Sequence, residues 1–131
     1  MRNKKIVLMI ISLMLIFGGI VRLFANETLF EIFGMKNLWI DHNYFIYIYK
    51  VLGAFVILTG LMFFTISKNL EKNLNILNTM KIGLIIIGIV MVTSGYFIKL
   101  PFLFYAPDFI FCFVIAFYLH TNMNLTKSNE K

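Results

Sequence analysis

The sequence predicts an all-α fold: a four-helix transmembrane bundle with short loops and an interfacial amphipathic segment between the first and second helices. The 131 residues are 60% hydrophobic and 14% charged, whereas soluble domains are about 45–50% apolar and about 25% charged. Apolar stretches fill residues 6–21, 51–66, 82–98 and 100–119, and a helix needs about 20 apolar residues to cross the hydrocarbon core. We therefore expect one integral membrane domain, residues 1–131, with no room for a separate soluble catalytic domain.

The expected helices cover roughly residues 6–24, 44–66, 80–99 and 107–124. The first follows a basic segment, but its apolar run is longer than that of a signal peptide and lacks a small-x-small cleavage site, which predicts a retained membrane anchor. The fourth is expected to begin at Pro107, because proline suits the first helical position and an acidic residue suits the first turn. The apolar residues just before it would form a short turn or re-entrant piece.

The loop between the first two helices is expected to lie on the outer interface as a short amphipathic helix. Leu29, Phe30, Ile32 and Phe33 alternate there with polar residues, and the spacing suits one apolar helix face. Gly34 is expected to end this helix. An aromatic belt at the depth of the lipid headgroups is predicted for Trp39, Tyr44, Tyr47 and Tyr49.

The second loop, residues 67–81, carries leucines at helical spacing and is expected to extend the second or third helix by a turn or two. Its basic residues suit contact with anionic lipid headgroups.

The distribution of basic residues predicts an inner (plasma) membrane protein with both termini cytoplasmic. That orientation places most Lys and Arg residues inside, as the positive-inside rule requires; they are Arg2, Lys4, Lys5, Lys68, Lys72, Lys81, Lys127 and Lys131. The lipid bilayer is then the main partner, and the net charge of +6 gives no reason to expect nucleic-acid binding.

The candidate functional residues are Arg22, Lys50 and Lys99, which lie at the ends of three apolar stretches. A charge within a membrane span is costly and marks a functional-site hypothesis. At about 100° per residue, each lies on or near the helix side that carries small residues, where membrane helices approach one another. We expect all three to face neighbouring helices near the outer leaflet, with Asp108 as a counter-charge at a similar depth.

Two interpretations of these residues remain open. In the first, Lys50 and Lys99 reach toward the interface and pair with Asp108, while Arg22 binds a lipid phosphate. In the second, the cluster forms a basic pocket that binds an anionic headgroup, a carboxylate metabolite or a polar quinone head.

The sequence favours a non-enzymatic protein and contains no catalytic motif of the common protease, NTPase, hydrolase or dithiol families. The lone Cys112 and the two histidines, His42 and His120, near opposite ends of the expected bundle, form no metal or haem site. Because the first three expected helices contain no carboxylate, a proton-coupled cation antiporter is disfavoured. No cofactor is predicted, although a bound quinone is kept as an alternative.

Three segments resemble the DoxX-like superfamily of small bacterial four-helix membrane proteins and their BphX-like relatives. They are Tyr49-Lys50-Val51-Leu52-Gly53-Ala54, Leu58-Thr59-Gly60-Leu61 and Gly95-Tyr96-Phe97-Ile98-Lys99. Members of that superfamily typically carry a basic residue, usually Arg, before a glycine-containing second helix and another at the end of the third. Both positions are Lys here, which lacks the bidentate geometry of a guanidinium. The resemblance implies a four-helix fold, and a link of some members to membrane-associated redox or sulfur metabolism.

Together these observations predict a small multi-pass protein whose outer basic pocket binds a lipid headgroup or a small amphipathic anion. The alternatives are a membrane subunit of a quinone-linked oxidoreductase and a small homo-oligomeric transporter. The protein is accordingly expected to act within a larger membrane complex or as a homo-oligomer.

Overall fold

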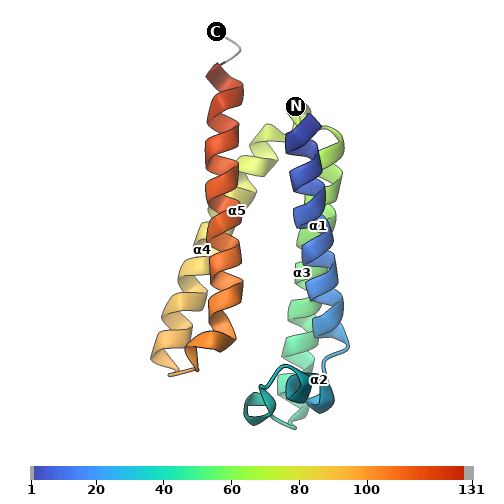
Figure 1. The fold of residues 1–131 in the computed structure, drawn as a ribbon, viewed down its shortest axis with the longest axis vertical. Coiled ribbons are helices and arrows are strands. Elements are labelled where there is room, and N and C mark those ends of the chain that lie inside the picture. The colour runs from blue at the N-terminus through green and yellow to red at the C-terminus, as the bar shows by residue number, and fades with distance from the viewer. Residues whose placement is uncertain (1, 129–131) are drawn as a thin grey trace. The chain divides into compact units, whose positions relative to one another are not determined.

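The computed structural model describes the backbone of residues 2–128 and the side chains of residues 3–121. Its helices and 3₁₀ turns follow the chain in the order α1 (Arg2–Leu23), α2 (Glu27–Ile32), η1 (Lys36–Leu38), α3 (Asn43–Lys68), η2 (Glu71–Asn73), α4 (Leu74–Phe97) and α5 (Phe102–Ser128) (Figure 1). The chain divides into two compact units, Met1–Lys68 and Asn69–Lys131. Each unit is a helical hairpin and is described by itself.

Within the described residues, four helices are long and apolar enough to cross a membrane: Asn3–Leu23, Asn43–Lys68, Glu71–Phe97 and Phe102–Thr121. Their large apolar side chains are widely exposed, with Phe17 69% and Leu103 83% accessible. Apolar surface on this scale is a liability in water and suits a lipid surrounding. The predicted all-α fold of four long apolar helices, with short loops and a short helix between the first two, is confirmed.

The helices satisfy their polar side chains internally, as a span in lipid requires. Thr59, Thr65 and Thr93 each donate a hydroxyl hydrogen bond to the carbonyl four residues earlier, at 2.9–3.0 Å. These residues therefore lie within the apolar spans without presenting an unsatisfied hydroxyl to lipid.

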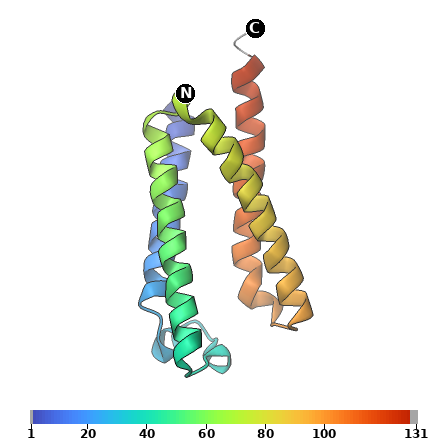
Figure 2. The same ribbon diagram turned by 180° about the vertical axis from the view of Figure 1, so that it is seen from behind.

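The first hairpin is held together by small residues on the facing sides of α1 and α3, which run side by side in both ribbon views (Figures 1 and 2). An added Cβ at Gly53 would lie 2.8 Å from the Gly19 carbonyl oxygen, and one at Gly60 would lie 3.0 Å from the Ser12 carbonyl oxygen. Ser12 and Gly19 are one heptad apart on α1, as are Gly53 and Gly60 on α3, so the contact repeats along the pair. Without side chains at these positions, the two backbones can approach closely.

The short helix α2 begins and ends with well-formed caps. The Asn26 side chain accepts a hydrogen bond from the Leu29 N–H at 2.9 Å, which satisfies one of the free donors at the helix start. At the other end Gly34 has φ 70°, and its N–H donates to the Glu31 carbonyl while the Met35 N–H donates to the Phe30 carbonyl. This pair of bonds is a Schellman motif, so the prediction that Gly34 ends the helix is confirmed.

The second hairpin pairs α4 with α5, and here glycines on α4 face aromatic rings on α5. A Cβ at Gly88 would lie 2.9 Å from the Phe113 ring, and one at Gly95 would lie 2.8 Å from the Tyr105 ring. Both glycines therefore lie on the contact face of α4, as expected for the side of a membrane helix that carries small residues.

The fourth long helix begins at Phe102, so the prediction of a start at Pro107 is wrong. Pro101 precedes this start, and its carbonyl accepts a hydrogen bond from the Phe104 N–H at 2.9 Å. Pro107 lies inside α5, where its missing N–H removes only the bond that the Leu103 carbonyl would accept. The apolar residues expected to form a turn or re-entrant piece are therefore the first turn of α5.

The third long helix also begins earlier than expected, at Leu74 rather than near residue 80. Leu77, which was expected in the loop, is 2% exposed and anchors this extension. The prediction that the loop would lengthen a neighbouring helix is thus confirmed.

Candidate functional site

The first hairpin contains a cavity of about 280 Å³ between the carboxyl end of α1 and the segment that includes α2. Phe17, Gly18 and Val21 of α1 line one side. Leu29, Phe30 and Met35 line the other. Arg22 is the one charged residue among the described residues of the lining, so the cavity combines apolar walls with a single guanidinium.

The Arg22 side chain is held by the packing of α1 on α3. Its Cβ occupies the space beside Gly53, where an added Cβ would lie only 2.9 Å away. Its Nη1 donates a long hydrogen bond of 3.3 Å to the Gly18 carbonyl one turn earlier. Arg22 also lies in the last turn of α1, where the helix dipole favours a cation. The Arg22 stem is therefore fixed beside the α1–α3 contact, and its guanidinium carries five N–H donors in all.

An aromatic cluster centred on Phe30 supports the wall of the cavity that α2 forms. The Phe30 ring is 5% exposed and makes edge contacts with Trp39 at 5.1 Å, Tyr49 at 5.5 Å and Phe45 at 6.5 Å between ring centroids. Phe45 and Tyr49 also stack at 5.9 Å. These contacts secure α2 and the following loop to the start of α3, so the cavity wall does not depend on the short helix alone.

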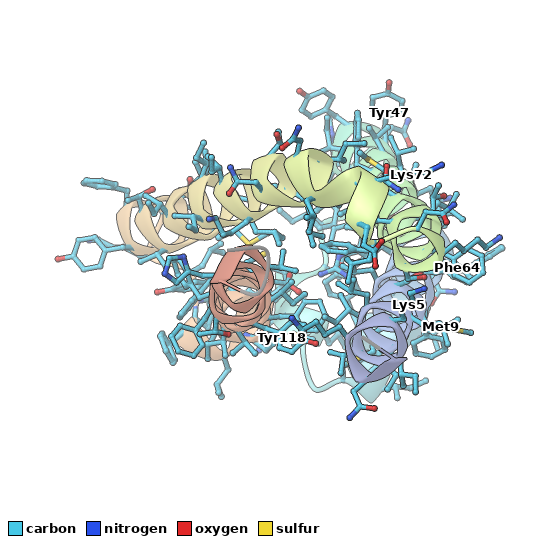
Figure 3. The ribbon with its side chains drawn as sticks, turned by 90° about the horizontal axis from the view of Figure 1, so that it is seen from above. Lys5, Met9, Tyr47, Phe64, Lys72 and Tyr118 are labelled. Carbon is cyan, nitrogen blue, oxygen red and sulfur yellow. The ribbon has the colours of Figure 1, made fainter. Side chains whose placement is uncertain are left out.

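This cluster divides the four residues of the expected aromatic belt into two kinds. Trp39 and Tyr49 pack against Phe30. In contrast, Tyr44 is 67% and Tyr47 is 62% exposed, and Figure 3 shows Tyr47 pointing away from α3. The depth of these rings in a membrane stays a prediction.

Lys50 lies one turn before Gly53 on α3, but it is exposed and does not line the cavity. Gly53 and Gly60 form the buried face toward α1, whereas Ala54, which the sequence placed nearer to Lys50, is exposed. Within this hairpin, then, Lys50 lies beside the contact face rather than on it.

Lys99 and Asp108 belong to the second hairpin. Lys99 is exposed and lies directly after α4, with φ 57°. Its N–H donates to the Tyr96 carbonyl and the Leu100 N–H donates to the Gly95 carbonyl, which is the same Schellman geometry that Gly34 forms. Asp108 is half-buried in the second turn of α5. The joint pocket of Arg22, Lys50, Lys99 and Asp108 stays a prediction, because its members are divided between the two hairpins.

Among the described residues, the other titratable groups form no metal site. Within the part of the chain that the structure describes, no group of three His, Cys, Asp or Glu residues is placed to hold a metal ion. Cys112 is buried, and the His42 Nδ1 accepts a hydrogen bond from the Tyr44 N–H at 3.2 Å near the start of α3. Lys36 forms ion pairs with Glu31 at 3.3 Å and Glu27 at 3.9 Å, and all three groups are exposed.

Sequence reasoning found Arg22 but missed the cavity beside it. The missing information was the position of α2, which folds back so that Phe30 and Met35 face the end of α1. The capping residues Asn26 and Gly34 signalled a short helix, but its direction depends on the aromatic contacts with α3. Of the basic residues counted for the orientation, Lys131 lies outside the described residues, as do the side chains of Arg2 and Lys127.

Comparison of the chain with models of protein families, with curated proteins and with solved structures gave no match. The class of protein therefore rests on the fold itself. Four helices able to cross a membrane, among the described residues, indicate a small multi-pass membrane protein.

Proposed function

We propose that this membrane protein is non-enzymatic and that its first hairpin binds an amphipathic anion, either a lipid headgroup or a small organic acid, at the Arg22 cavity. The observation that carries the proposal is a guanidinium fixed at the edge of an otherwise apolar cavity of about 280 Å³. A ligand with one anionic group and an apolar body matches both parts of that cavity.

The energetics favour an anion there. A hydrogen bond to a charged group contributes about 1.5–3 kcal/mol, more than a neutral bond, and arginine can bind a carboxylate or phosphate through two parallel N–H groups. None of the described residues that line the cavity is acidic, so the lining carries the positive charge of Arg22 alone. Lys50, on the same hairpin, adds positive charge without contacting the cavity.

The orientation is part of the proposal. With both termini cytoplasmic, Lys68 and Lys72 lie on the cytoplasmic side, as the positive-inside rule favours. The loop that holds α2 then lies on the outer side, at the end of the first hairpin (Figure 1). The Arg22 cavity would accept its ligand from the outer leaflet.

The test uses the purified full-length protein in nanodiscs that contain either phosphatidylcholine alone or phosphatidylcholine with phosphatidylglycerol. We expect the anionic lipid to raise the unfolding temperature of the native protein and to raise it much less in Arg22→Gln. Arg22→Lys should retain part of the effect, because it keeps the charge and loses the planar fork.

Lys36→Gln is the matched control. It removes one positive charge from the loop that follows α1, at an exposed residue outside the cavity lining. A loss of lipid stabilisation in Lys36→Gln as large as in Arg22→Gln would show a general charge effect and would remove the proposal.

The quinone-linked subunit, the homo-oligomeric transporter and the resemblance to the DoxX-like superfamily stay predictions. Mass spectrometry of an organic extract of the purified protein separates the first of these from the proposed function. A stoichiometric quinone would favour the oxidoreductase subunit, and anionic lipid or an organic acid would favour the proposed binder.

A further inference from the structure

The second hairpin contains a separate open groove of about 530 Å³ that the sequence did not indicate. Lys81 and Ile85 of α4 and Phe113, Ala116, Phe117 and His120 of α5 line it. Every lining residue belongs to this one hairpin, at the end opposite the α4–α5 turn. The groove is therefore independent of the Arg22 cavity, and nothing below rests on the function proposed for that cavity.

The groove has a polar end and an apolar floor. Lys81 and His120 are its only polar residues among the described lining, and His120 directly follows the apolar stretch of residues 100–119. A lysine ammonium has three N–H donors, and an imidazole keeps at least one in either protonation state. The polar end therefore offers several donors and at least one positive charge, with no acidic residue in the described lining.

The floor is shaped by packing between α4 and α5. The Phe113 ring lies against Gly88, where an added Cβ would come within 2.9 Å of it, so the ring is fixed as a wall. Ala116 is 3% exposed, and its small side chain leaves space above it in the groove. Phe117, which is 70% exposed, continues the apolar surface along α5.

We propose that this groove binds an anionic phospholipid of the surrounding bilayer. The phosphate lies between Lys81 and His120, and an acyl chain follows Ile85, Phe113 and Phe117. Charge complementarity and depth support this occupant: Lys81 directly precedes the apolar stretch of residues 82–98 and His120 directly follows that of residues 100–119, and the end of an apolar stretch is where a phospholipid carries its phosphate above its acyl chains. A soluble anion would leave the apolar floor unused.

The experiment is native mass spectrometry of the full-length protein released from nanodiscs containing phosphatidylglycerol and phosphatidylcholine in equal amounts. In the Arg22→Gln background, which lacks the other proposed lipid site, we expect one retained phosphatidylglycerol. Its apparent affinity should fall about fivefold when Lys81→Gln is added, since a Lys or Arg near an anionic membrane surface contributes about that factor, and it should fall further when His120→Gln is added as well. Lys81→Arg should retain the lipid, which shows that a loss in the other variants is not a loss of fold.

Two controls separate this site from other sources of lipid binding. Lys72→Gln removes a charge from the exposed side chain on η2 that Figure 3 shows pointing away from the helices, and we expect it to retain the lipid. Arg22→Gln should also retain it, because that residue lies in the other hairpin. Circular dichroism of each variant checks that the helices are intact.

Three results would overturn the proposal. They are an equal loss in Lys72→Gln and Lys81→Gln, equal retention of phosphatidylcholine and phosphatidylglycerol by the native protein, and displacement of the lipid by millimolar inorganic phosphate. The last result would mean that the polar end binds a free anion and that the apolar floor contributes nothing.

Discussion

The Ser12 hydroxyl donates a hydrogen bond of 2.8 Å to the Gly60 carbonyl across the interface between α1 and α3. Ser12 is completely buried, and the absence of a side chain on Gly60 leaves its carbonyl accessible. Ser12 therefore joins the two helices by a hydrogen bond at the point where Gly60 lets their backbones approach.

Ser12→Ala should lower stability by a modest amount, because hydrogen bonds between membrane helices contribute about 0.6 kcal/mol on average and rarely more than about 1.7. Thr93→Val is the comparison, since the Thr93 hydroxyl bonds only within its own helix. Equilibrium unfolding in mixed micelles measures both variants. Equal effects of the two would show that the interhelical bond contributes nothing specific.

Gly53→Ala should destabilise the first hairpin more than Ser12→Ala does. Its new Cβ would lie 2.8 Å from the Gly19 carbonyl oxygen and 3.0 Å from the Leu23 nitrogen, and backbone atoms cannot move aside as a flexible side chain can. The helices must separate, with a cost of about 1–3 kcal/mol typical of overpacking.

Gly83→Ala is the matched control for that substitution. Nothing lies within 4 Å of an added Cβ at Gly83, and alanine is the better helix former by about 1 kcal/mol. Its unfolding temperature should be unchanged or higher. A loss of stability in Gly83→Ala equal to that in Gly53→Ala would contradict the packing explanation.

Lys99→Gly should raise stability by about 1 kcal/mol, because Lys99 adopts the left-handed backbone conformation that glycine accepts without steric cost. Lys99→Val should lower it, since a β-branched side chain is poorly tolerated at positive φ. Lys99→Asn separates the effect of charge on stability from that of backbone conformation, because asparagine is neutral and tolerates the left-handed region. Thermal unfolding in detergent gives all three values, and a stable valine variant would contradict the expected order.

Phe30→Ala should loosen α2 and reduce ligand binding at the Arg22 cavity together. The substitution removes the centre of the aromatic cluster, and truncation of a buried phenylalanine costs about 3–5 kcal/mol in well-packed cores. Hydrogen exchange should increase in α2 and in the loop up to Trp39 while the second hairpin keeps its protection. Tyr47→Ala, at an exposed ring, should change neither region.

Much of this fold could be predicted because lipid imposes a simple rule. Spans must be helical and apolar, so length and composition located all four long helices. Helix periodicity also identified the buried faces of Gly53, Gly60, Gly88 and Gly95, since small residues gather where helices meet. Of the adjacent Gly18 and Gly19, only Gly19 contacts α3, and two neighbouring glycines give no indication in the sequence of which one faces the partner.

The errors have a different origin. Pro107 followed by an acidic residue predicts a helix start, yet a proline in the second turn of a helix removes only one backbone hydrogen bond, and Pro101 already precedes the start. Lys99 was considered for its charge, although its observed position is set by backbone hydrogen bonds. The cavity and the groove depend on how side chains from different elements converge, and no pattern along a single helix contains that information.

The glycine face of α1 is covered by α3 within the first sixty-eight residues. This has a consequence for biosynthesis: both helices of the α1–α3 pair are present when the ribosome has completed α3. The first hairpin can therefore assemble as a finished pair while α4 and α5 are still being made, and the second hairpin, with its own glycine and aromatic contacts, can follow as a second pair.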